Sequence, residues 1–300
     1  MAIGDIDRVD PARLDGCSYV DTGMYDVANY GAAYLLEGER PALVETGIGT
    51  HHERVLDLLS SAGVEREELA FICPTHVHLD HAGGAGFLAR ECPNATVCVH
   101  ERGVRHLAEP SRLIAGTKAA VGDQWRFYTE PEPVAPDRLR ALVDRDVIDL
   151  GDRRLVAVEV PGHASHQHAF HVPEDDAVFT GDAAGLYDPR DGSIHPTSPP
   201  PEFDLEQCLD DIDRIRALAP STLLYTHFGV GDDPALLDRY EVVLTDWVAA
   251  VREAVESEAD VDSAIDVIVD GHAEVDRWGA TKARAETAMN ARGVIGYLDR

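Results

Sequence analysis

Short apolar runs alternate with turn residues along most of the chain, and this pattern predicts a mixed α/β body. Apolar runs bounded by glycine, proline or polar clusters are typical of buried strands, whereas a spacing of three to four is typical of helices. The expected strands cover residues 18–22, 27–37, 42–47, 69–73, 95–99, 147–149, 154–160, 167–172, 177–180 and 221–226. The expected helices cover residues 53–61, 83–91, 101–107, 111–120 and 204–218.

The last part of the chain has no strand pattern. Residues 234–300 are mostly acidic, and their apolar positions recur at helical spacing over about 234–257, 261–269 and 278–297. We therefore expect a body of residues 1–233 and a helical C-terminal extension of residues 234–300. The extension is expected to pack on the body, with a cap over a cleft or a homodimer interface as alternatives.

The order of elements favours two packed sheets with helices outside them. Two proline-rich stretches, residues 131–136 and 194–201, interrupt this order. Long loops between sheet elements often form part of a substrate site. The pattern leaves open whether these two stretches form a substrate wall or are plain connectors.

The charge balance narrows the class of partners. The chain has 26 basic and 55 acidic residues, a net charge of −29, and Lys118 and Lys282 are its only lysines. Such an acidic field disfavours nucleic acids as partners. Acidic residues spread along the chain, with almost no lysine, are typical of extreme halophiles, where molar salt shortens the Debye length to about 3 Å.

Location and redox state are also constrained. No apolar run approaches the roughly 20 residues that span a bilayer, and residues 1–5 show no signal-peptide pattern, so the expected location is cytoplasmic without membrane association. The five cysteines include no C-x-x-C pair, and we expect them to be free thiols.

The densest chemistry in the sequence is Thr-His-Val-His-Leu-Asp-His at residues 75–81. His76, His78, Asp80 and His81 lie within six residues, directly after an expected strand. Neutral imidazoles and a carboxylate suit zinc and similar ions. Four such side chains are too few to complete one metal site and also contribute to a second, so we expect further ligands elsewhere in the chain.

Three later residues occupy equivalent places. His163, Asp182 and His227 each come directly after an apolar strand. A lone His or Asp at a strand end is usually a turn residue. If the strands lie side by side, however, all three residues project from the sheet edge that carries the histidine motif.

This constellation resembles the metallo-β-lactamase superfamily of metallo-hydrolases, and in particular its glyoxalase II-like and lactonase-like branch. The pattern H-x-H-x-D-H, followed by a distant His, Asp and His, is matched in full and in order between about Tyr19 and Phe228. The resemblance implies an αββα sandwich of four layers, in which two mixed sheets pack together with helices outside.

The resemblance also implies a role for each residue. His76, His78 and His163 would bind one metal ion, Asp80, His81 and His227 would bind a second, and Asp182 would bridge both. The ions are expected to be two Zn²⁺, with iron or manganese as alternatives. Glu45 stands where the family usually has an aspartate, and we expect it to support the turn or a ligand histidine.

The implied reaction is hydrolysis of a small ester, thioester or lactone by a hydroxide shared between the two ions. Asp80 would hold this hydroxide as well as bind metal, so Asp80 and Asp182 are the expected catalytic residues. The alternatives are a phosphodiester hydrolase of the same superfamily and a non-catalytic metal-binding or redox di-iron protein. His78 argues against the redox protein, since di-iron relatives tend to carry Glu there.

The other histidines are expected to have no part in the site. His166 is expected in a polar loop, with contact to substrate as the alternative, and His168 on a strand face. The surface is the expected place of the histidines without a family counterpart, namely His51, His52, His100 and His106.

Overall fold

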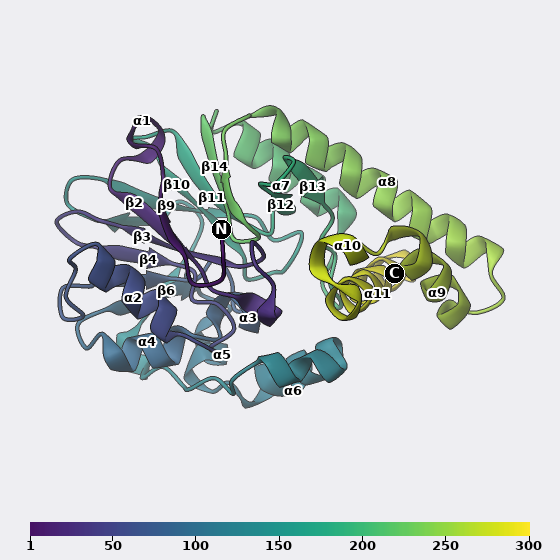
Figure 1. Cartoon of the computed structure of the whole chain (residues 1–300), viewed down its shortest axis with the longest axis horizontal. Coiled ribbons are helices and arrows are strands. Elements are labelled where there is room, and N and C mark those ends of the chain that lie inside the picture. The colour runs from purple at the N-terminus through teal and green to yellow at the C-terminus, as the bar shows by residue number, and fades with distance from the viewer.

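Two mixed β-sheets form the centre of the computed structural model, which describes residues 1–300 (Figure 1). The first sheet has the order β1-β2-β3-β4-β5-β6-β7, with β1 Ile6–Arg8, β2 Cys17–Asp21, β3 Ala32–Leu36, β4 Ala42–Val44, β5 Phe71–Cys73, β6 Thr96–His100 and β7 Leu139–Leu142. The second has the order β15-β14-β11-β10-β9-β8, with β8 Val147–Asp149, β9 Arg154–Glu159, β10 His168–Val172, β11 Ala177–Gly181, β14 Thr222–Tyr225 and β15 Gly229–Gly231. A separate hairpin pairs β12 Leu186–Asp188 with β13 Ser193–His195.

Helices cover the outer faces of both sheets. The helices before the second sheet are α1 Pro11–Leu14, α2 Glu53–Ser61, α3 Leu79–Ala82, α4 Ala85–Glu91, α5 Val104–Ala108 and α6 Ser111–Val121. Those after it are α7 Leu205–Arg216, α8 Ala235–Ser257, α9 Val261–His272, α10 Val275–Trp278 and α11 Ala280–Leu298. Short 3₁₀ turns are η1 Met24–Asp26, η2 Gly122–Phe127 and η3 Pro136–Arg138.

Three apolar clusters hold these layers together. The cluster between the sheets contains Tyr34 and Phe71 from the first sheet and Phe170 from the second. A second cluster joins the outer face of the first sheet to α2 and α4, and a third joins the outer face of the second sheet to α7, α8, α9 and α11. The predicted sandwich of two sheets with helices outside, together with a helical C-terminal segment, is therefore confirmed.

Several boundaries differ from the pattern-based prediction. The strand expected at 27–37 begins only at Ala32, because the chain turns through Asn29, whose φ is +56°. The second half of the histidine motif is helix α3 rather than a loop. Strands β1, β7, β12, β13 and β15 were not predicted; all are three or four residues long, too short for a clear alternation.

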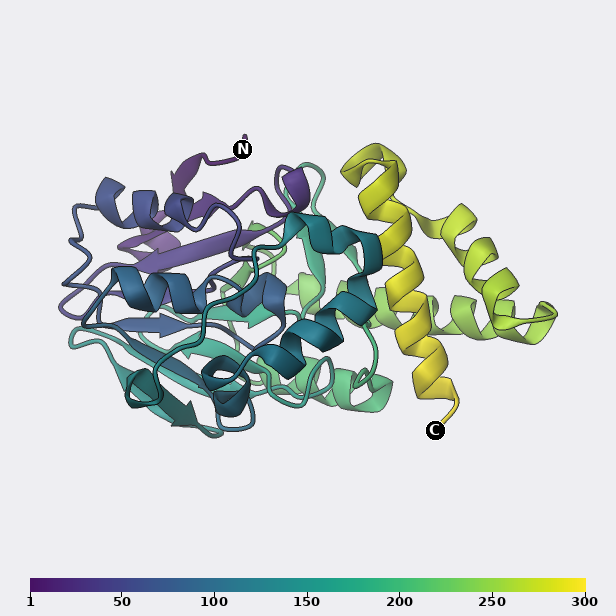
Figure 2. The ribbon, with the colours of Figure 1, turned by 90° about the horizontal axis from the view of Figure 1, so that it is seen from below.

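The C-terminal helices lie beside the body rather than apart from it. Figure 2 shows α11 standing next to α6, which projects from the first half of the chain. Helix α6 has no buried residue, so its apolar side chains remain available to a ligand. No helix is both long and apolar enough to cross a membrane.

Candidate metal centre

The predicted ligands all lie beyond strand ends, either in the turn that follows or in the short helix α3. His76, His78, Asp80 and His81 follow β5, His163 follows β9, Asp182 follows β11, and His227 follows β14. Strands β4 and β5 run parallel, as do β11 and β14. Because the ends of parallel strands meet at one edge of a sheet, residues far apart in sequence are brought together.

His76, His78 and His163 form one half of this centre. Nε2 of His76 lies 2.9 Å from Nδ1 of His78, and Nε2 of His163 lies 3.2 Å from the same atom. His76 and His163 are buried, and His78 is half-buried. The three rings thus present nitrogens to one point, which is the grouping that the resemblance implies for the first ion.

Asp80, His81 and His227 form the other half, and Asp182 lies between the halves. Oδ1 of Asp182 lies 3.2 Å from Nε2 of His81, and its Oδ2 lies 3.2 Å from Nε2 of His163. His227 Nε2 lies 3.6 Å from Asp182 and 4.0 Å from Asp80. One carboxylate therefore faces ligand groups on both sides, as a bridging ligand would.

Electrostatics keep His76, His163 and Asp182 in the forms that bind metal. Burial, reinforced by the neighbouring histidines, holds the pKa of His76 well below its usual range, and burial lowers the pKa of His163 to about 3, so both rings are neutral near pH 7. Burial alone would raise the pKa of Asp182, but His81 and His163 outweigh it and lower that pKa. A lone pair and a carboxylate charge are thus available to a cation.

Glu45 orients the ligand His81, as the sequence predicted. Its Oε1 lies 3.1 Å from Nδ1 of His81 and accepts hydrogen bonds from the hydroxyls of Thr75 at 2.5 Å and Thr226 at 2.8 Å. The backbone carbonyl of Tyr30 does the same for His227, accepting from Nδ1 at 2.8 Å. Partners on Nδ1 leave Nε2 of both rings directed at the centre.

The residues present fit a pair of metal ions. Nε2 of His81 and Oδ1 of Asp182 are buried without a hydrogen-bond partner. Buried polar atoms are nearly always satisfied, and orphans clustered with other donors indicate a missing cation. Imidazole and carboxylate donors without cysteine suit zinc or a similar divalent ion.

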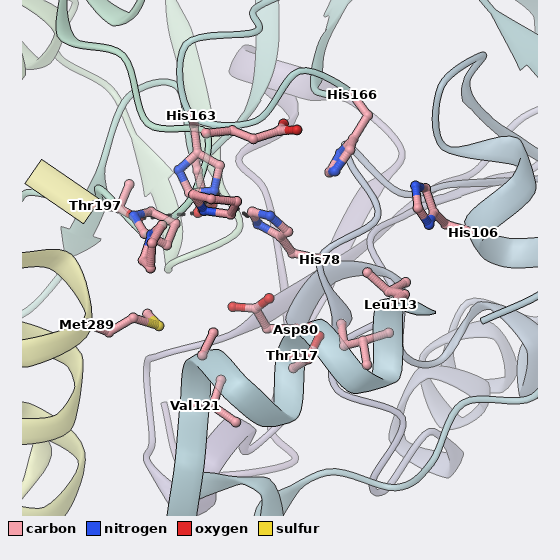
Figure 3. A pocket seen from close by; sticks show the side chains of 18 of the residues that line it. His78, Asp80, His106, Leu113, Thr117, Val121, His163, His166, Thr197 and Met289 are labelled. Carbon is pink, nitrogen blue, oxygen red and sulfur yellow. Dashed lines mark hydrogen bonds and ion pairs between the residues drawn. The ribbon is translucent and has the colours of Figure 1, made fainter. Parts of the chain in front are cut away.

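A cavity of about 970 Å³ opens above this centre. Asp80, His78 and His163 lie at its floor, and Val121 on α6 and Met289 on α11 lie near each other on its wall (Figure 3). Of the two proline-rich stretches, only the second reaches the cavity, through Thr197 and residues 199–201. The helical extension therefore contributes to the cavity wall as well as packing on the body.

Sequence reasoning missed the cations on this wall. Arg102, Arg105 and Arg112 line the cavity, and all three are exposed. Their grouping within eleven residues of an otherwise acidic chain is the sequence signal that could have indicated them. His166 also lines the cavity and lies beside His78, with ring centroids 5.3 Å apart, so its alternative role in contact with substrate is the one its position favours.

Comparison with known proteins agrees with this geometry. The family model described as the metallo-beta-lactamase superfamily matches residues 27–227. The chain belongs to this superfamily. The solved structure of the archaeal superfamily protein ST1585 from Sulfolobus tokodaii has a TM-score of 0.69 at 21% identity and covers 95% of this chain and 99% of that one. The superfamily protein TTHA1429 from Thermus thermophilus has a TM-score of 0.66 at 23% identity, over 90% and 88% of the two chains.

Some relatives of the chain have described activities. The chain is 28% identical to the acyl-coenzyme A thioesterase MBLAC2 of Homo sapiens, over 58% of this chain and 64% of that protein. It is also 28% identical to the hydroxyacylglutathione hydrolase of Synechococcus sp. (strain JA-3-3Ab), over 74% of this chain and 75% of that enzyme. Both relatives are hydrolases of this superfamily, which supports an enzymatic role for the present chain.

Proposed function

We propose that the chain is a metal-dependent hydrolase that cleaves thioesters joining an apolar acyl group to an anionic carrier. The observation that carries the proposal is the position of the ligand cluster at the floor of a cavity with an apolar wall and an arginine-rich rim. Its thioesterase and hydroxyacylglutathione hydrolase relatives support a thioester substrate.

His76, His78 and His163 would hold one ion, Asp80, His81 and His227 the other, and Asp182 would contact both. Bound divalent ions supply Lewis acidity, which activates a water and polarises a carbonyl oxygen. The carboxylate of Asp80, whose side chain is 26% exposed, can accept the proton of an attacking water at the cavity floor. His166 lies beside this point and can orient the carbonyl group.

Helices α6 and α11 suit the acyl group. Leu113, Gly116 and Val121 on α6 face the same cavity as Met289 on α11. Helix α6 has no fully buried residue, so an acyl chain that lies against it would cover apolar atoms that are still exposed. Each buried methylene contributes about 0.8 kcal/mol, which favours longer acyl chains.

The arginines suit the carrier. Arg102 donates to the carbonyl of Ser165 at 3.2 Å, and neither it nor Arg105 or Arg112 forms an ion pair with a carboxylate, whereas Lys118 in the same region is paired with Glu130. Glutamates 101 and 202 share the rim, and Glu202 accepts the amide of Ser165 at 2.7 Å. Unpaired guanidinium groups are well suited to phosphate.

The test compares carriers at a constant acyl group. Zinc-loaded protein in molar KCl is assayed with butyryl, octanoyl and dodecanoyl thioesters of coenzyme A and of N-acetylcysteamine, which lacks phosphate. The triple variant Arg102→Gln, Arg105→Gln, Arg112→Gln should raise KM for the coenzyme A esters about tenfold, with N-acetylcysteamine esters unchanged.

The matched control removes the same charge elsewhere. Arg252, Arg284 and Arg292 are exposed and do not line the cavity, so their triple change to Gln should leave both KM values unchanged. Equal losses for both carriers would refute the role of the arginines. Turnover of phosphodiesters with none of thioesters, by fully loaded protein, would refute the proposed function itself.

A further inference from the structure

A second group of metal-binding side chains lies outside the centre described above. His100 ends β6, Glu159 ends β9, and His168 begins β10. His168 and Glu159 are directly opposite in the β9–β10 ladder, while His100 comes from the other sheet. None of the three lines the cavity, and none belongs to the sevenfold ligand set, so this junction of the two sheets needs its own explanation.

The three side chains are spaced as ligands of one ion. One donor atom from each residue lies within 4.8 Å of the others, and Nε2 of His100 lies 3.3 Å from Oε1 of Glu159. Tetrahedral zinc with bonds of about 2.0–2.1 Å separates its ligand atoms by about 3.3 Å. The two rings lie 4.7 Å apart, centroid to centroid.

Burial makes this group anomalous without a ligand. His168 is fully buried, and neither of its ring nitrogens has a hydrogen-bond partner. His100 is 3% exposed, so its expected place on the surface was wrong: the packing of the second sheet against β6 covers it. Burial lowers the pKa of His168 to about 3, which leaves its ring neutral and an electron pair available. A buried imidazole without a hydrogen-bond partner, beside a carboxylate, indicates that a ligand is bound between them.

We propose that His100, Glu159 and His168 bind a divalent transition-metal ion of the zinc class, which joins the two sheets. Two imidazoles and one carboxylate are a common ligand set for such ions. The side chain of Glu159 is 33% exposed, which gives the ion a path from solvent and leaves room for a water as the fourth ligand.

Binding requires one rearrangement at His100. The amide of Arg102 donates to its Nδ1 at 3.1 Å, so the neutral ring carries its proton on Nε2, toward Glu159. For Nε2 to bind metal, the proton must move to Nδ1 and the amide contact must open. Arg102 is exposed, so water can accept its amide proton instead, at the cost of about one hydrogen bond.

The experiment counts bound metal. Protein stripped of metal is dialysed against Zn²⁺ in molar KCl, and against Co²⁺, whose visible absorption reports its ligands. We expect three equivalents for the wild type. Glu159→Gln keeps the shape of a half-exposed side chain, so the variant should fold, and it should bind two equivalents, or the third at least tenfold more weakly. Binding of the third ion should raise the melting temperature of the wild type, and Glu159→Gln should not show this rise.

Two further variants locate the loss. Glu174 is an exposed carboxylate at the far end of the same strand pair, where it forms an ion pair with Arg154. The variant Glu174→Gln should still bind three equivalents of metal. Asp182→Asn weakens the cavity centre but should leave the Co²⁺ signal of the His100 site. Equal stoichiometry and affinity in the wild type and Glu159→Gln would overturn the proposal, as would loss of the Co²⁺ signal of the His100 site in Asp182→Asn. Activity is not a readout here, so failure of the proposed function leaves this test intact.

Discussion

The floor and the wall of the cavity are built in opposite ways. The floor consists of residues that follow strand ends, such as His81 on α3 and Asp182 after β11, which are buried and in contact with each other, while Glu45 contacts His81. The wall consists of α6, which has no buried residue, and one face of α11. A rigid floor suits chemistry that needs fixed distances, whereas a lightly packed wall suits a substrate site that differs among relatives. The following variants test this division.

The largest effect is expected from the residue that contacts both halves of the floor. Asp182→Asn removes the charge between His81 and His163 while keeping the side-chain shape. We expect kcat to fall at least about 10³-fold and bound metal to fall below that of the wild type. Hydrolysis rates and metal content, measured on the same preparation, check this. Asp210→Asn, on the exposed side of α7, is the control, and wild-type turnover by Asp182→Asn would contradict a shared centre.

Changing a residue that supports a metal ligand should reduce activity less than changing the ligand itself. Glu45→Gln removes the carboxylate charge facing His81 but retains an oxygen for the hydroxyls of Thr75 and Thr226. Losing such a partner typically weakens metal affinity 10–100-fold. Competition with a metal chelator would measure the change, and saturating metal should restore most of the turnover. An unchanged chelator profile would mean that Glu45 only shapes the turn.

Substitutions in the cavity wall should alter the selectivity for acyl-chain length and leave the metal site at the floor unchanged. Gly116 lies on α6, lines the cavity, and has open space where a Cβ would be. Gly116→Leu should therefore fill the acyl channel, lowering kcat/KM for a dodecanoyl thioester about tenfold while leaving the butyryl ester within about twofold. Gly271→Leu, another helical glycine with open space around it, is the control outside the cavity. Equal losses for both chain lengths would place the acyl group elsewhere.

A further prediction concerns stability and pH. The pKa of His168 is depressed to about 3 in the folded protein, against about 6.5 in the unfolded chain. Its contribution is therefore present above pH 6.5 and is lost as the pH falls toward the folded pKa, by up to about 1.4 kcal/mol per pH unit. In metal-free protein, His168→Gln should flatten the fall in the free energy of unfolding between pH 6.5 and 4, measured by denaturant titration. An identical slope would show that His168 does not titrate in this range.

The ligand set could be predicted from the sequence because its signal is local. Four of the predicted ligands lie in one motif after β5, and the other three follow the ends of β9, β11 and β14, so the strand before each of them marks its place. Glu45 was placed beside a ligand histidine for the same reason. The short strands β12, β13 and β15 were missed because three residues carry too little alternation to be recognised.

By itself, the sequence determined the fold class and predicted the seven candidate ligands of a hydrolase, since strand ends and ligand types are properties of neighbouring residues. Only the tertiary structure decided what surrounds them. His78 and His163 are 85 positions apart, α6 meets α11 beside the cavity, and His100 meets His168 only where the two sheets join. These distances depend on how the layers pack, and no local pattern of residues encodes that packing.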